Sequence, residues 1–168
     1  MKFIRMISSV HKWDGTNRVK REDATICGDA ISDLRTTGNK LSIWLGDNDE
    51  DIDDALVALA LARSNVQKIV CLGLDENELS KMQITAETES GKVGGLGEAI
   101  LRKHRNLVDI DYKRLGMLAE YMSRLASDKQ NHIECLKKGI KELLDKYERE
   151  GKIDKSKVGQ GIKNDMGW

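Results

Sequence analysis

A run of acidic residues followed by an apolar run, at positions 47–62, limits the possible folds of this chain more than any other feature. Carboxylates fill positions 49–51, 53 and 54, and positions 55–62 are all Ala, Leu or Val. Carboxylates in the first turn of a helix are stabilised by the partial positive charge at its N-terminus. A helix that is apolar nearly all round must be covered on more than one side. We therefore expect a buried helix ending near Arg63, with Leu56, Leu59 and Ala60 in the core.

Segments typical of strands lie on both sides of this helix. Short apolar or alternating runs bounded by Gly, Asn and Asp favour strands. Such runs predict strands at Lys2–Val10, Leu41–Leu45, Lys68–Gly73 and Ile84–Thr88. Helical spacing of apolar residues and a capping aspartate predict helices at Glu22–Leu34 and Asp75–Met82. Strands that alternate with helices need crossover connections. The sequence thus predicts an α/β fold with a small, partly parallel sheet of three or four strands.

Helical periodicity dominates after residue 88. A glycine-rich connector at Glu89–Gly97 and a short helix near Ala99–Lys103 precede two amphipathic segments, Leu115–Ala126 and Ile133–Tyr147. Two helices joined by a short polar link pack as an antiparallel hairpin, so we expect a C-terminal helical hairpin. We expect residues 1–88 and 89–150 to be an α/β and a helical subdomain of one domain. The Lys- and Gly-rich residues 151–168 are expected to form a flexible basic tail.

Charge and cysteine content restrict the class of protein. The chain has 28 basic and 28 acidic residues, so no net field favours binding to nucleic acid or an anionic membrane. The segment 1–15 is too polar for a signal peptide or a membrane span, which favours a cytoplasmic protein with no membrane partner. Cys27, Cys71 and Cys135 are odd in number and widely spaced. We therefore expect three unpaired thiols rather than a disulfide framework.

Three local patterns are typical of ligand sites but incomplete. The acidic run has the alternating oxygens of a calcium loop without its glycine or its closing glutamate, so helix capping explains it better. The glycine-rich segment Ser90–Gly97 matches no phosphate-binding pattern and is interpreted as a linker. On a helix, His132 and Cys135 would share one turn, but no second pair has zinc-ligand spacing. We therefore expect neither a metal nor a cofactor.

The preferred hypothesis from the sequence is a non-enzymatic accessory, adaptor or immunity-type subunit that binds another protein or a second copy of itself. The sequence holds no catalytic motif that names a reaction. The two long C-terminal helices carry apolar stripes that a small sheet would cover incompletely, which would leave an interaction patch. Exposed Trp44 or Trp168 are the expected interface anchors, and Lys137 and Lys141 lie on the flanks of the expected hairpin.

Two other functional classes remain open. A small enzyme or nucleotide-binding domain would place its site at the carboxyl ends of parallel strands, with Asp47, Asp49 and Asp75 as contributors. His104 would be its general base, but no nucleophile or carboxylate partner is identifiable, so a structural or surface histidine is favoured. A nucleic-acid-binding protein would combine an aromatic ring with basic groups, as at His11, Lys12, Trp13, Arg18, Lys20 and Arg21.

Overall fold

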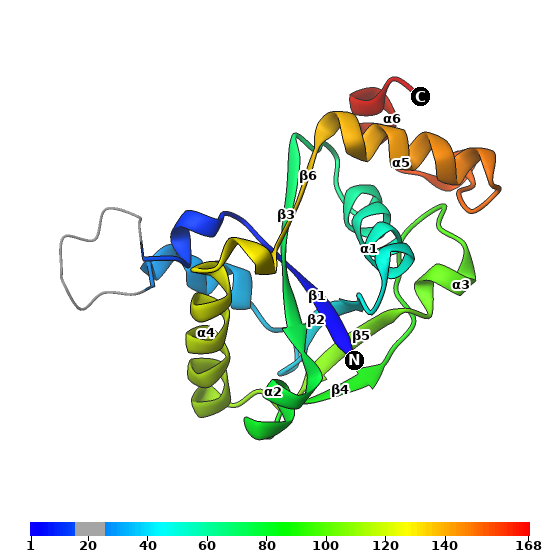
Figure 1. Cartoon of the computed structure of the whole chain (residues 1–168). Coiled ribbons are helices and arrows are strands. Elements are labelled where there is room, and N and C mark those ends of the chain that lie inside the picture. Colours follow the sequence, from blue (N-terminus) through cyan, green and yellow to red (C-terminus); the bar gives the residue numbers. More distant parts are fainter. Residues whose placement is uncertain (16–25) are drawn as a thin grey trace.

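The computed structural model describes residues 1–15 and 26–168, and these residues form a six-stranded sheet with helices on both faces (Figure 1). Neighbouring strands are antiparallel throughout the described sheet, in the order β4-β5-β2-β1-β3-β6. The strands are β1 (Lys2–Ile7), β2 (Leu41–Leu45), β3 (Lys68–Asp75), β4 (Thr85–Thr88), β5 (His104–Val108) and β6 (His132–Leu136). The α/β class is as predicted, but the small, partly parallel sheet is wrong.

The position of β1 explains this correction. Strands β2 and β3 both pair antiparallel with β1, so they run in the same direction. The helix between them, α1 (Asp49–Leu61), therefore makes the crossover that the sequence predicts. Because β1 lies between β2 and β3, the two parallel strands are not neighbours. Strands β5 and β6 enlarge the sheet, and both come from the part of the chain that was expected to be helical.

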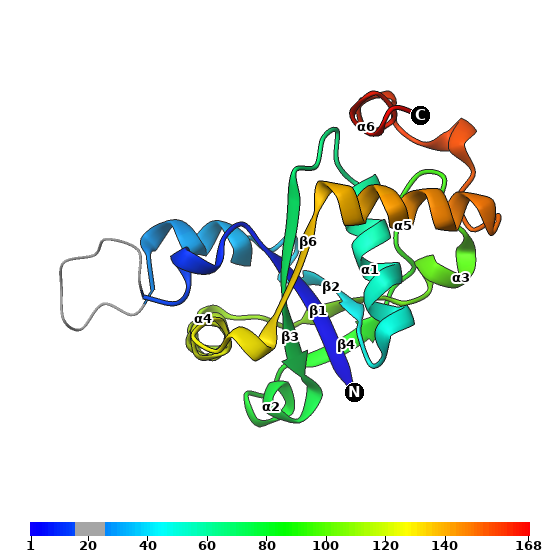
Figure 2. The ribbon, with the colours of Figure 1, turned by 45° about the horizontal axis from the view of Figure 1, so that its top comes forward.

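The predicted helical hairpin is also wrong. Helices α4 (Tyr112–Ala126) and α5 (Lys137–Arg149) are separated by β6 and pack in different hydrophobic clusters. Figure 2 shows them on opposite sides of β3 and β6. Ile133 to Leu136 form a strand rather than the first turn of a helix. That strand takes the chain from one face of the sheet to the other, so the two helices never contact as a hairpin.

One face of the sheet carries α1, α3 (Glu98–Leu101), α5 and α6 (Gln160–Met166). Helix α1 begins as predicted, because the Asn48 side chain accepts a hydrogen bond from the Asp51 amide at 3.0 Å and three carboxylates fill the first turn. Leu56 and Ala60 are buried, which confirms the prediction, whereas Leu59 is only half-buried. The helix is therefore covered on most of its circumference, with one exposed edge.

The other face carries two 3-10 helices, η1 (Val10–Lys12) and η2 (Gly28–Leu34), together with α2 (Glu76–Lys81) and α4. Trp13 is fully buried here, and its indole N–H donates to Asp33 Oδ2 at 2.9 Å. Asp33 Oδ2 also accepts from the Ser8 amide at 3.0 Å. These bonds fix the chain that leaves β1. The helix expected from Glu22 starts outside the described residues, and its described part is η2.

The last residues pack against the body of the protein instead of forming the expected flexible tail. After η4 (Lys155–Lys157), helix α6 buries Ile162 and Met166, and Val158 is buried just before it. These three apolar residues recur every fourth position, which is one face of a helix. The many Lys and Gly residues between them conceal this stripe in the sequence. No helix of the described residues is long and apolar enough to cross a bilayer.

Candidate functional site

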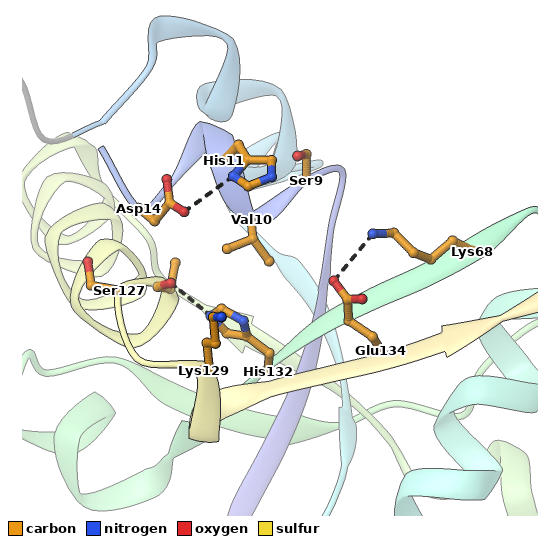
Figure 3. A pocket seen from close by; sticks show the side chains of 10 residues that line it. Ser9, Val10, His11, Asp14, Lys68, Ser127, Lys129, His132 and Glu134 are labelled. Carbon is orange, nitrogen blue, oxygen red and sulfur yellow. Dashed lines mark hydrogen bonds and ion pairs between the residues drawn. The ribbon is translucent and has the colours of Figure 1, made fainter. Parts of the chain in front are cut away.

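A cavity of about 660 Å³ lies on the η1 and α4 face of the sheet (Figure 3). Its walls come from η1, the start of β3, the last turn of α4, η3 (Lys129–Asn131) and the start of β6. Volumes of this size are typical of sites for small ligands. The cavity gathers titratable side chains from segments far apart in the chain, namely His11, Asp14, Lys68, Lys129, His132 and Glu134.

The most constrained of these groups is the imidazole of His132, the first residue of β6. Its Nε2 lies 2.8 Å from the carbonyl oxygen of Ala126, at the end of α4. A carbonyl oxygen only accepts hydrogen bonds, so Nε2 carries the proton and Nδ1 carries the lone pair. Asp128 accepts from the Gln130 amide at 3.0 Å and holds the turn between α4 and β6. The backbone thus fixes one tautomer of His132, with Nδ1 as a proton acceptor.

His11 stands on the opposite wall, where η1 follows β1. Its Nδ1 lies 3.5 Å from Asp14 Oδ2, three residues along the chain, and its side chain is 76% exposed. Figure 3 shows this pair at the rim of the cavity, across from His132. At this separation the contact is longer than a normal hydrogen bond. The His11 side chain is largely exposed to solvent at this rim.

Two lysines bring positive charge to the same space. Lys68 Nζ lies 3.3 Å from Glu134 Oε1, across the β3–β6 pair, and both side chains are nearly half exposed. Lys129, in η3, supplies a second ammonium group to the lining. Two ammonium groups, two carboxylates and two imidazoles therefore face one cavity. Such a lining suits a polar molecule with an anionic group, because ammonium groups make charge-assisted hydrogen bonds to phosphate or carboxylate oxygens.

The sequence-predicted carboxylates meet elsewhere. Asp47, Asp49 and Asp75 line a second cavity of about 380 Å³. They converge because β2 and β3 run in the same direction, which brings their carboxyl ends to one edge of the sheet. Asp47 Oδ1 accepts from the Lys2 amide at 2.6 Å, and Asp75 Oδ1 accepts from the Asn77 amide at 2.8 Å as the cap of α2. His104 is not in this cavity, so the structure joins three of the four candidate catalytic residues.

Asp47 and Asp75 therefore cap or brace the backbone. Among residues 1–15 and 26–168, no three His, Cys, Asp or Glu side chains are placed to hold one ion. His132 and Cys135, which would share a helical turn, lie on a strand instead and point to opposite faces of the sheet.

Two tryptophans proposed as contact residues are buried. Trp44 is 4% exposed and packs against the His104 ring with a centroid separation of 5.1 Å, so it is not an exposed interface anchor. Trp13 is 0% exposed and is not accessible for stacking on a base. His11 and Lys12 lie in η1 beside it. Arg18, Lys20 and Arg21, the rest of the proposed nucleic-acid loop, lie outside the described residues.

The other proposed interface residues belong to the C-terminal packing. Trp168 is half-buried, and its indole N–H donates to Asp145 Oδ1 at 2.8 Å. Lys137 Nζ lies 2.5 Å from Asp165 Oδ1 and holds α6 to α5. Lys141 is exposed on α5. Two of these three side chains therefore already have partners within the chain.

The sequence interpretation missed most of the cavity. Lys68, Lys129 and Glu134 were not singled out, and His132 was considered only as a zinc ligand. One sequence signal for this cavity was available: His132 and Glu134 are two residues apart, which places both on the same face of a strand. Comparisons with known proteins find no matching family model, no similar curated protein and no similar solved structure.

Proposed function

We propose that this protein is a small enzyme that binds a phosphorylated small molecule in the His11–His132 cavity and moves a proton on it. The observation that carries the proposal is His132, whose tautomer is fixed by Ala126 within a ligand-sized cavity that also holds two lysines. This is the enzyme alternative of the sequence analysis at a new location. The site lies between η1, α4 and β6, not among the three aspartates at the strand ends.

The roles of the residues follow from their chemistry. His132 Nδ1 is the base, because its lone pair accepts a proton from a hydroxyl or a water molecule of the bound ligand. Lys68 and Lys129 hold the phosphate oxygens and stabilise the negative charge that results. His11, paired with Asp14, returns a proton from the opposite wall. Moving a proton from one position of a bound molecule to another requires a base and an acid on facing walls, and the cavity has this arrangement.

Nuclear magnetic resonance of ¹⁵N-labelled imidazoles tests ligand binding. Inorganic phosphate and a nucleoside monophosphate serve as probes. We expect saturable shifts of the His11 and His132 ring signals and none of His104, which lies on the other face of the sheet. Lys129→Ala should weaken binding by about tenfold or more, because it removes a charge-assisted hydrogen bond. Lys141→Ala, an exposed lysine on α5, is the matched control.

A result against the proposal is equally clear. Equal shifts at all three histidines, or none at millimolar probe, would show that the cavity does not select phosphate. A Lys129→Ala variant that binds as well as the control would remove the lysine from the site. Circular dichroism of both variants checks that the fold is retained.

The protein-interface hypothesis stays a prediction, but the observation on which it depended has changed. It assumed that the apolar stripes of α4 and α5 are partly uncovered. The apolar residues of these stripes are buried instead: Leu118 and Met122 of α4 pack on one face of the larger sheet, and Ile140 and Leu144 of α5 pack on the other. The remaining large apolar side chains that are exposed in the described residues are scattered over separate elements: Met1, Ile31, Tyr112 and Leu136.

A further inference from the structure

His104 has a hydrogen-bonded serine that the sequence alone did not reveal. His104 Nδ1 lies 2.7 Å from the carbonyl oxygen of Glu89, and His104 Nε2 lies 2.6 Å from Ser42 Oγ. The carbonyl oxygen only accepts, so Nδ1 carries the ring proton and Nε2 carries the lone pair. The Ser42 hydroxyl therefore donates to Nε2. A nucleophile, a base and a group that orients the base are thus joined in one chain of hydrogen bonds.

The fold holds this arrangement in place. Ser42 lies on β2 and His104 on β5, and the register pairs Ser42 with Asn106 and Trp44 with His104. The four side chains therefore share one face of the sheet, opposite to the His11–His132 cavity. Trp44 meets the His104 ring edge-on, at a centroid separation of 5.1 Å. The imidazole is thereby packed on one side and hydrogen-bonded at both nitrogens.

The segment that supplies the Glu89 carbonyl is also tightly placed. Gly91 donates its amide to Leu101 O at 2.9 Å. A Cβ at Gly91 would lie 2.9 Å from the Trp44 ring and 3.3 Å from His104 Cβ, so a larger residue would displace this segment. Glycine at position 91 lets the chain pass directly over the ring and brings the carbonyl of Glu89 to Nδ1.

We propose that Ser42 is a nucleophile, activated by His104, that reacts with small activated esters. The Ser42 Oγ lone pair attacks the ester carbonyl carbon while His104 Nε2 takes the hydroxyl proton. The carbon–oxygen bond to the leaving alcohol then breaks, and the alcohol leaves with that proton. Water, activated by the same imidazole, attacks the acyl-serine and releases the carboxylic acid. Each step uses only the ester, water and these two side chains.

Two features of the surroundings support this chemistry. Ser42 is exposed, so a substrate reaches its hydroxyl from solvent. Asn106 lies directly across from Ser42, and its amide nitrogen is 2.6 Å from Glu89 Oε2, which also pairs with Lys40 at 3.1 Å. Both donors bind the side chain of Glu89, whose backbone carbonyl orients His104, so they hold the orienting residue in place.

A fluorophosphonate probe tests the proposal on the intact protein. Attack of Ser42 Oγ on phosphorus expels fluoride, and the hydroxyl proton passes to His104 and then to solvent. We expect mass spectrometry to find the label on Ser42 and not on Ser80, an exposed serine on α2. Labelling in His104→Gln should fall by about a hundredfold, the usual effect of removing a general base. Lys141→Ala should label normally, because this exposed lysine lies on α5 and belongs to neither candidate site.

The comparison of Ser42 with Ser80 needs no variant, so a folding defect in His104→Gln does not affect it. Equal labelling of the two serines overturns the proposal, and so does normal labelling of a folded His104→Gln. A purely structural Ser42–His104 pair gives these two results. Labelling of Ser42 without phosphate binding in the cavity would sustain this inference while refuting the proposed function.

Discussion

At the scale of single residues, Lys103 shows how the fold tolerates buried charge. Lys103 Nζ lies 2.6 Å from Asp51 Oδ1 and 2.5 Å from Asp54 Oδ2, and the Asp54 side chain is 3% exposed. Burial alone would lower the pKa of Lys103, but its hydrogen bonds to the two carboxylates outweigh burial and raise it. The ammonium group thus joins the first turns of α1 to the start of β5.

Removal of this ammonium group should be costly. Lys103→Met leaves the Asp54 carboxylate buried without a counter-charge, and breaking such a pair costs about 3–5 kcal/mol of unfolding free energy. Urea denaturation at neutral pH measures the loss. Lys113→Met, an exposed lysine on α4, should change the midpoint little. Identical midpoints for the two variants would show that the Asp54 pair contributes nothing.

At the scale of elements, one carboxylate of α6 bonds to two other parts of the chain. Asp165 Oδ1 lies 2.5 Å from Lys137 Nζ on α5, and Asp165 Oδ2 accepts from the Val66 amide at 2.8 Å, just before β3. The hydrogen bond from Lys137, followed by the one from Val66, lowers the pKa of Asp165 below its usual value. The helix is therefore attached to two other elements by a carboxyl group whose ionised form these bonds stabilise.

This attachment should depend on pH. A carboxyl group whose pKa is lower in the folded than in the unfolded protein stabilises the fold above its unfolded pKa, about 3.9. That contribution is lost as the pH falls through the lower, folded pKa. Asp165→Asn should therefore be less stable than the native protein at pH 7 and close to it at the acidic end of the transition. Urea midpoints across this range measure the difference, and a constant gap at all pH values would contradict the assignment.

At the scale of the whole molecule, the sheet separates two hydrophobic cores. Strand β3 contributes side chains to both, and its Cys71 is fully buried on the α1 face. Burial raises the pKa of the Cys71 thiol to about 12. Cys27 and Cys135 are half-buried. Access of a reagent to Cys71 therefore requires that α1 and α5 separate from the sheet.

Thiol reactivity should report this architecture. With a disulfide reagent at pH 8, we expect Cys27 and Cys135 to react in the native protein, and Cys71 to react only at the rate of global unfolding. Quantification by mass spectrometry distinguishes the three sites. All three should react in denaturant without reductant, as expected for unpaired thiols. Rapid native labelling of Cys71 would show that the two layers open independently.

The sequence by itself determined the elements whose signal is local. Helix α1 is specified by its acidic cap and apolar run, and strands β2 and β3 by short runs of Leu, Ile and Val. Because α1 makes β2 and β3 parallel to each other, the convergence of Asp47 and Asp75 also followed from the pattern. These features depend on residues close together in the chain, and local propensity and periodicity are sufficient to predict them.

Only the tertiary structure decided the order of strands and the candidate sites. Insertion of β1 between β2 and β3 depends on backbone pairing between distant segments, which leaves no local signature. Strand β6 has polar side chains on one face, so its sequence resembles the start of an amphipathic helix. The strand order brings His11 and His132 to one cavity and Ser42 into hydrogen-bond contact with His104. Their chemistry is a property of side chains brought together across the sheet, which no spacing along the chain encodes.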